Sequence, residues 1–195
     1  MPDFRAEILD YLELEKEAIS RLDIRALSDA LCALVEACER EARIFTLGNG
    51  GSAATASHMV CDFNKGISAY SPKKFRMTCL SDNIPTLMAI ANDISYEDVF
   101  AEQLRGELKK GDVVLAISGS GNSKNIIKAV EYAKGEGAVI IGMCGYDGGR
   151  LKELSDFVMH AEIDDMQISE DLHMVFDHMM MRVLCNYYGG EACGC

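Results

Sequence analysis

The stretch GDVVLAISGSGNS, residues 111–123, carries the clearest fold signal in the chain. Residues 113–117 form an unbroken apolar run, which is typical of a strand buried on both faces of a parallel sheet. A loop with three serines and two glycines follows, and residues 123–135 then show helical spacing. A buried strand, a glycine-rich loop and a helix in this order predict one repeating unit of an α/β fold.

The same order recurs on both sides of this stretch. Further strand candidates are found at 43–47, 75–80, 139–143 and 157–159. Helical segments are predicted at 52–66, 84–91, 96–109, 149–155 and 168–188. The chain contains only three prolines and no linker. We therefore expect a single domain over residues 1–195, with an N-terminal helical pair in 1–41 and a core in 42–195 around a central parallel sheet.

Composition narrows the possible functions. The 195 residues carry a formal net charge of −12 and are 49% apolar, as in an ordinary globular protein. The negative charge argues against sequence-independent binding of nucleic acid or of an anionic membrane. No apolar run is long enough to cross a bilayer, and the first residues lack a signal-peptide pattern. The expected location is the cytoplasm.

The eight cysteines do not form a recognisable metal or redox motif. No Cys-x-x-Cys pair is present, so the sequence supports neither a zinc ribbon nor a thioredoxin-like site. Six cysteines lie singly in apolar segments, which predicts reduced and mostly structural thiols. Cys193 and Cys195 form a Cys-x-Cys at the last residues of the chain.

A second glycine-rich loop, residues 48–53, follows the strand candidate at 43–47. Its G-x-G-x-x-A pattern matches the dinucleotide fingerprint, but Asp82 comes 34 residues after Gly48 rather than about 20. The next helix also carries His58 and Asp62, which is unusual for such a site. A nicotinamide or flavin site is therefore a minor interpretation, and a P-loop is excluded because no Gly-Lys-Ser/Thr follows either loop.

The serine-rich loop favours an anion site. Glycines let the backbone approach a ligand, and the N–H groups at a helix start point towards an anion. Ser118, Ser120 and Ser123 add hydroxyl donors without adding charge. The alternative is a simple turn with Ser123 as the helix N-cap, but capping requires one serine rather than three. The loop therefore predicts a phosphate cradle.

Histidines and carboxylates on two helices predict a second polar centre. His58 and Asp62 are spaced i, i+4, and Glu170 and His178 lie on one stripe of the last helix. If the helices meet, the four side chains can bind one divalent metal. The alternative is solvated helix faces with ordinary ion pairs. The same helix is rich in methionine, which suits either a subunit contact or an intramolecular core.

These segments together resemble the SIS (sugar isomerase) domain and, within it, the phosphoheptose isomerases. The resemblance covers the whole chain and rests on five motifs in order, namely GNGGSAATASH (48–58), IANDISYEDVF (90–100), GDVVLAISGSGNS (111–123), GYDGG (145–149) and E-x-x-H-x-x-x-x-H (170–178). It implies a flavodoxin-like three-layer αβα sandwich with a central five-stranded parallel sheet. It also implies a homotetramer whose active sites contain residues of more than one subunit.

The resemblance further implies roles for individual residues. The implied substrate contacts are Asn49, Gly50, Gly51, Ser52, Asn92, Asp93, Ser118, Gly119, Ser120, Ser123 and Glu170, of which the loop residues 118–120 and 123 hold the phosphate. The implied ligands of one divalent metal, zinc, are His58, Asp62, Glu170 and His178. The implied reaction converts sedoheptulose 7-phosphate to D-glycero-D-manno-heptose 7-phosphate through an enediol, with Asp62 as base and His178 as acid–base partner.

The sequence departs from the family pattern at several positions. Asp62 stands where these enzymes usually have Glu, and Glu170 stands where they usually have Gln. Gln167 occupies a commonly acidic position, and Lys65 is the nearest cation to a usual arginine. The competing hypothesis is a non-catalytic SIS regulator that senses a sugar phosphate and binds a protein such as a replication initiator. Such a regulator has no need of the four ionisable residues, so we expect an enzyme.

Overall fold

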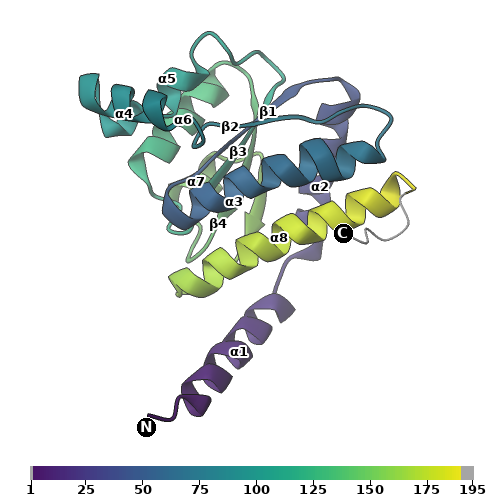
Figure 1. Ribbon diagram of the computed structural model, residues 1–195, viewed down its shortest axis with the longest axis vertical. Coiled ribbons are helices and arrows are strands. Elements are labelled where there is room, and N and C mark those ends of the chain that lie inside the picture. Colours follow the sequence, from purple (N-terminus) through teal and green to yellow (C-terminus); the bar gives the residue numbers. More distant parts are fainter. Residues whose placement is uncertain (1, 190–195) are drawn as a thin grey trace.

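The computed structural model describes residues 2–189, and its centre is a five-stranded parallel sheet in the order β2-β1-β3-β4-β5 (Figure 1). The strands are β1 (Arg43–Leu47), β2 (Arg76–Cys79), β3 (Val113–Ser118), β4 (Val139–Cys144) and β5 (Phe157–His160). Each coincides with a predicted strand to within two residues. The predicted α/β class and parallel sheet are confirmed.

Strand β3 lies at the centre because all six of its residues are buried. Val113, Leu115 and Ile117 face one hydrophobic core, and Val114 and Ala116 face the other. This alternation follows from the two-residue period of a strand. An unbroken apolar run is therefore what a central strand with helices on both faces requires.

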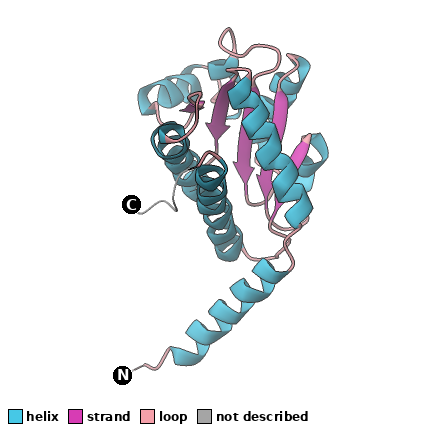
Figure 2. Ribbon diagram, turned by 90° about the vertical axis from the view of Figure 1, so that its right-hand side faces the viewer, coloured by secondary structure: helices cyan, strands magenta, loops and turns pink. Residues whose placement is uncertain are grey.

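Helices cover both faces of the sheet (Figure 2). On one face lie α2 (Ile24–Glu39), α3 (Gly50–Cys61) and α8 (Met166–Tyr187). On the other face lie α5 (Ala101–Leu104), α6 (Lys124–Gly135) and α7 (Gly149–Leu154). The result is the three-layer sandwich that the resemblance implied.

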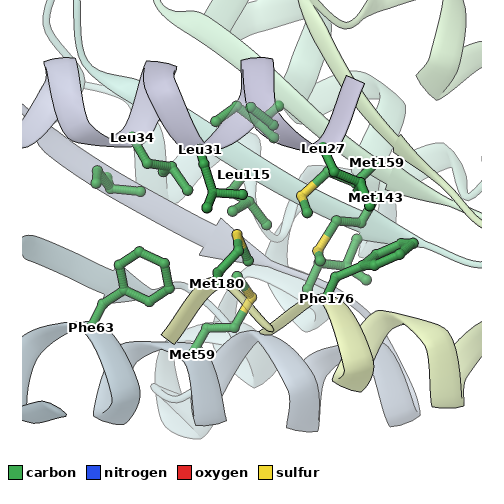
Figure 3. Packing of buried hydrophobic residues seen from close by; sticks show 14 of the residues in the cluster. Leu27, Leu31, Leu34, Met59, Phe63, Leu115, Met143, Met159, Phe176 and Met180 are labelled. Carbon is green, nitrogen blue, oxygen red and sulfur yellow. The ribbon is translucent and has the colours of Figure 1, made fainter. Parts of the chain in front are cut away.

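Methionines fill much of the first core (Figure 3). Met59 from α3, Met180 from α8, and Met143 and Met159 from the sheet all belong to this core, and all four are fully buried. Unbranched, flexible side chains fill the irregular space between helices and a twisted sheet. At Met180 the methionine-rich stripe of α8 therefore forms an intramolecular core.

The first helix, α1 (Arg5–Ser20), stands away from the rest of the molecule in both views (Figures 1 and 2). Only Ala18 of this helix is buried. A hydrogen bond from the Tyr11 hydroxyl to Asp171 links it to α8. The predicted N-terminal helical pair is present, but only α2 packs fully against the sheet.

Two predicted helices are interrupted. The segment at 52–66 is α3 up to Cys61 and then a π-helical turn, Asp62–Gly66, followed by a 3₁₀ turn, Ile67–Ala69. The prediction of one helix over 96–109 is wrong, because a 3₁₀ turn, Tyr96–Asp98, precedes the four residues of α5. Gly106 then adopts a φ of +78°, which a right-handed helix cannot accommodate. Helix α4 (Ile84–Asp93) is present as predicted.

The thiols follow the prediction only partly. Cys38, Cys79, Cys144 and Cys185 are buried, whereas Cys32 and Cys61 are exposed. Cys193 and Cys195 lie outside the described residues. Within residues 2–189, no helix combines the length and apolar character that crossing a bilayer would require.

Candidate functional site

Both glycine-rich loops lie at the carboxyl edge of the sheet, side by side. The loop at 48–52 follows β1 and the loop at 118–123 follows β3, and these strands are neighbours paired through Leu47 and Ala116. Ligands of open α/β sheets bind at this edge, where successive helices pass to opposite faces of the sheet. Helix α3 passes to one face and α6 to the other.

A cavity of about 170 Å³ opens between the two loops. Its lining residues are Asn49, Ser52, Ile117, Ser118, Gly119, Ser120, Ser123, Met166 and Glu170. The structure thus brings together most of the predicted substrate contacts around one space. Glu170 is the only titratable side chain in this lining, and the other polar groups that a ligand would meet are serine hydroxyls, the Asn49 amide and the backbone.

The serine hydroxyls are not used to cap the following helix. Ser123 occupies the N-cap position of α6, but its side chain makes no capping hydrogen bond. Instead, the Ser118 hydroxyl donates to the Ser123 hydroxyl over 3.3 Å. The simple capping interpretation of this loop is therefore wrong for Ser123, which lines the cavity at the N-terminus of α6.

Glycines allow the close approach of backbones around this loop. Gly121 has a φ of +65°, and an added Cβ there would come within 2.0 Å of the Gly148 carbonyl oxygen. The backbone N–H of Gly145 donates to the Gly119 carbonyl over 2.8 Å. The GYDGG motif therefore supports the serine loop from the neighbouring strand end rather than lining the same cavity.

A second polar cluster lies between α3 and α8. The side chains of His58, Asp62, Asp177 and His178 each offer a ligand atom, and these atoms all lie within 4.8 Å of one another. The Nε2 atom of His58 is 3.2 Å from His178 Nε2, 3.7 Å from Asp62 Oδ2 and 4.0 Å from Asp177 Oδ2. Asp62 begins the π-helical turn, an irregularity that is frequent at functional sites.

The geometry of this cluster fits a divalent metal. Two ligand atoms on a tetrahedral ion at 2.0–2.1 Å are about 3.3 Å apart, close to the separation of the two imidazole nitrogens. Both carboxylate oxygens of Asp177 are buried without a hydrogen-bond partner. Such a carboxylate requires a cation or a proton. Imidazole and carboxylate are ligands that zinc and several other divalent metals accept.

The electrostatics of the cluster also favour a bound cation. Burial, followed by repulsion from the nearby Asp62 carboxylate, raises the pKa of Asp177 to about 7. Two carboxylates close together in a poorly hydrated site repel each other unless positive charge lies between them. The neighbouring His173 is also fully buried, and burial lowers the pKa of its imidazole to about 4.

Sequence reasoning missed Asp177 and grouped Glu170 with the cluster instead. Glu170 lies two turns earlier on α8 and lines the serine cavity, where an added Cβ on Gly51 would meet Glu170 Oε2 at 2.5 Å. A signal for Asp177 was available. It is a carboxylate inside an apolar stretch of helix, next to His178, and a buried charge in such a stretch requires a partner.

The remaining predicted contacts lie outside the cavity. Asn92 and Asp93 are exposed at the end of α4, where the Asn92 amide donates to Asp93 over 2.7 Å. Gly50 begins α3 with a φ of +53° and an exposed backbone. Asn49 lines the cavity, but its amide is paired with Asn125, a residue that the sequence analysis did not single out.

Comparisons with known proteins agree with this architecture. The SIS domain family matches residues 5–145. A phosphoheptose isomerase from Helicobacter pylori is 36% identical over 187 residues, covering 92% of this chain and 91% of that protein. A solved phosphoheptose isomerase from Neisseria gonorrhoeae superposes with a TM-score of 0.83 at 26% identity, covering 93% of this chain and 96% of that one. Another, from Francisella tularensis, shares the fold with a TM-score of 0.86 at 24% identity, covering 94% and 98% of the two chains.

Proposed function

The chain belongs to the SIS domain family and, within it, to the phosphoheptose isomerases, and on this basis we propose that it isomerises sedoheptulose 7-phosphate to D-glycero-D-manno-heptose 7-phosphate. One observation carries the proposal beyond family membership. The serine cavity and the His/Asp cluster lie along the same pair of neighbouring helices, α3 and α8. Gly51 and Glu170 meet at one end of this pair, and His58 and His178 meet two turns further on, roughly 10 Å away.

This separation suits a substrate with an anion at one end and a carbonyl at the other. The hydroxyls of Ser118, Ser120 and Ser123 and the N-terminus of α6 bind the phosphate. The bound phosphate then holds the sugar in a defined orientation, which lowers the entropic part of the barrier. The carbonyl end extends towards the His/Asp cluster.

The reaction exchanges protons between two carbons and two oxygens. A carboxylate removes a proton from C1 of the ketose while O2 gains one, which gives an enediol. The carboxylate then returns its proton to C2 while O1 loses one, which gives the aldose. We assign the carbon-to-carbon transfer to Asp62 and the transfer between oxygens to His178, because an imidazole can donate and accept at neutral pH.

His58, Asp62, Asp177 and His178 would hold one divalent metal per site, and we infer zinc. A metal there would polarise the substrate oxygens and lower the cost of negative charge on them. Asp177 takes the place that the resemblance implied for Glu170. The buried carboxylate of Asp177 would help to hold such a metal beside the two histidines. Glu170 instead contributes an acceptor to the cavity wall, where a sugar hydroxyl can donate to it.

We also propose that copies of the chain associate, as a homotetramer with sites between subunits. Helix α1 exposes Ile8, Leu9 and Leu12, whose exposed fractions are 57%, 62% and 52%. An apolar stripe of this kind on a projecting helix is stabilised by packing against another chain. Mass measurement in solution tests this, and Leu9→Glu with Leu12→Glu should reduce the assembly to smaller species. We place the protein in the cytoplasm, where phosphorylated sugars are metabolised.

The test of function is turnover of sedoheptulose 7-phosphate by the purified protein, with and without chelator and with zinc added back. Turnover that disappears with chelator and returns with zinc supports the isomerase and its metal. Metal-independent turnover would leave Asp62 and His178 as an acid–base pair without a metal. Absence of turnover under all three conditions, together with tight sugar-phosphate binding, would instead favour the regulator.

A further inference from the structure

The loops that form the cavity separate at the place where the sheet ends. Strands β1 and β3 are paired up to Leu47 and Ala116, and beyond them α3 and α6 pass to opposite faces. Backbone hydrogen bonds of the sheet therefore stop at the base of the crevice. Beyond this point, the width of the cavity depends on the contacts between the two loops themselves.

A reciprocal pair of side-chain amides spans this crevice. Asn49 Nδ2 donates to Asn125 Oδ1 over 2.9 Å, and Asn125 Nδ2 donates to Asn49 Oδ1 over 2.8 Å. Asn49 lies in the loop after β1, and Asn125 is the second residue of α6, directly after the serine loop. Asn125 is 2% exposed, and its Oδ1 also accepts from the Ile126 backbone N–H over 3.0 Å. The Asn125 side chain is therefore held both by Asn49 and by the backbone of its own helix.

A third segment completes the arrangement. The Tyr96 hydroxyl donates to Asn49 Oδ1 over 2.9 Å. Tyr96 belongs to a segment that is tied to α6 by two ion pairs, Lys124–Glu97 at 3.0 Å and Lys128–Asp98 at 2.7 Å. The loop after β1, the start of α6 and residues 96–98 thus converge on the single amide of Asn49.

The hydrogen-bonding capacity of Asn49 then decides what it can offer a ligand. A side-chain amide has two acceptor positions on its oxygen and two N–H donors on its nitrogen. Tyr96 and Asn125 occupy both acceptor positions, and Asn125 occupies one donor. One N–H remains, and Asn49 lines the cavity.

We propose that Asn125 is a positioning residue of the phosphosugar site, which locks the Asn49 amide so that its one free N–H faces an oxygen acceptor of the ligand. The identity of the ligand as a sugar phosphate rests on the proposed function, whereas the locked amide does not. Asn125 acts only through Asn49 and through the spacing of the two loops. It touches neither the reacting carbons nor the metal cluster.

The decisive variant is Asn125→Leu, which keeps the size of the side chain and removes its hydrogen bonds. Freed from its partner, the Asn49 amide rotates, so KM for sedoheptulose 7-phosphate should rise about tenfold with a much smaller change in kcat. In an Asn49→Ala background, Asn125→Leu should have little further effect on KM. If the effects of the two single substitutions on KM multiply in the double variant, Asn125 acts independently of Asn49. That result would overturn the proposal.

Tyr96→Phe provides a second variant that does not threaten folding, because Tyr96 is 62% exposed. It removes one of the two donors to Asn49 Oδ1, and KM should rise about threefold, again only when Asn49 is present. Thr46→Val is the matched control. It deletes a buried hydrogen bond of similar kind, from Thr46 Oγ1 to the Ala56 carbonyl at 3.0 Å, and should leave KM unchanged.

Two readouts are independent of turnover. In side-chain amide NMR spectra, the Asn49 NH₂ signals should exchange slowly with solvent in the wild type and at least tenfold faster in Asn125→Leu. The affinity for inorganic phosphate should fall in the same variant. If the wild type fails to turn over sedoheptulose 7-phosphate while both readouts change as stated, the proposed function fails and the positioning role stands. Unchanged exchange and unchanged affinity in Asn125→Leu would reject the positioning role whatever the activity.

Discussion

His58 and His178 are 120 residues apart in the chain, and their Nε2 atoms lie 3.2 Å from each other between α3 and α8. At this distance the two nitrogens can share one proton or bind one metal ion. The buried carboxylates of Asp62 and Asp177 beside them make the metal the better explanation, since a shared proton leaves Asp177 without a partner.

Replacing one of these histidines should remove both activity and metal. His178→Ala is expected to lower kcat by about 10²–10⁴-fold and to abolish metal binding, because it deletes the proposed acid–base group together with one candidate metal ligand. Isomerisation kinetics and metal analysis of the purified variant provide the measurement. Asn186→Ala, an exposed change two turns further along α8, serves as control and should behave like the wild type. Full turnover in His178→Ala would move the acid–base chemistry to another residue.

Asp177→Asn should have opposite effects with and without metal. The folded-state pKa of Asp177 is raised from 3.8 to about 7, so its carboxylate destabilises the metal-free fold increasingly as pH rises through this interval. In chelator at pH 8, Asp177→Asn should therefore increase the free energy of unfolding by up to about 4 kcal/mol. With zinc present it should lower stability, because a ligand is lost. Urea unfolding of both proteins, in chelator and with zinc, at pH 4.5 and pH 8, measures these two effects. A variant less stable than wild type at pH 8 in chelator would contradict the explanation.

His173 should make the fold sensitive to mild acid. Burial lowers the pKa of its imidazole from 6.5 to about 4. Between these two pH values the unfolded chain therefore binds a proton at His173 that the folded chain does not bind. Stability is then fully present above pH 6.5 and falls by up to about 3 kcal/mol as pH decreases towards 4. Chemical unfolding between pH 7 and pH 4 shows the slope, and His173→Leu should flatten it over this window. An equally steep slope in the variant would assign the acid sensitivity to other groups.

Removing two hydroxyls from the serine loop should weaken phosphate binding. Ser120→Ala combined with Ser123→Ala is expected to raise the dissociation constant for a sugar phosphate about 10- to 100-fold, because two donors to an anion are lost. Titration calorimetry measures this directly. Ser155→Ala deletes a hydroxyl bonded to the Leu151 carbonyl outside the cavity and should bind normally. Unchanged affinity in the double variant would remove the phosphate cradle.

Glu170→Gln separates the two roles considered for this residue. Glu170 lines the serine cavity beside Gly51, so neutralising it should strengthen binding of an anionic ligand several-fold and lower KM. Because Glu170 lies outside the His/Asp cluster, zinc affinity should remain within about twofold of wild type. A marked loss of zinc affinity would instead make Glu170 the metal ligand that the family resemblance implied.

The sequence alone determined the layers of the fold and predicted one half of the candidate site. The apolar run at 113–117 identified the central strand because burial on both faces leaves no room for alternation, and the alternating helices and strands predicted the sheet. The serine loop predicts an anion site from local chemistry alone, since glycines, hydroxyls and a helix start are contiguous in the chain. The i, i+4 spacing of His58 and Asp62 likewise predicted that both point to the same side, and it needed no tertiary information. Asp62 is the residue at which α3 passes into the π-helical turn.

Tertiary structure decided which groups meet across elements. Spacing on α8 shows which residues share a stripe, but the register of α3 against α8 decides that Asp177, rather than Glu170, joins His58 and Asp62. That register comes from side-chain packing in the methionine-rich core, which involves residues distant in sequence. The pairing of Asn49 with Asn125 has the same origin. The residues are 76 positions apart, and only the adjacency of β1 and β3 brings their amides across one crevice.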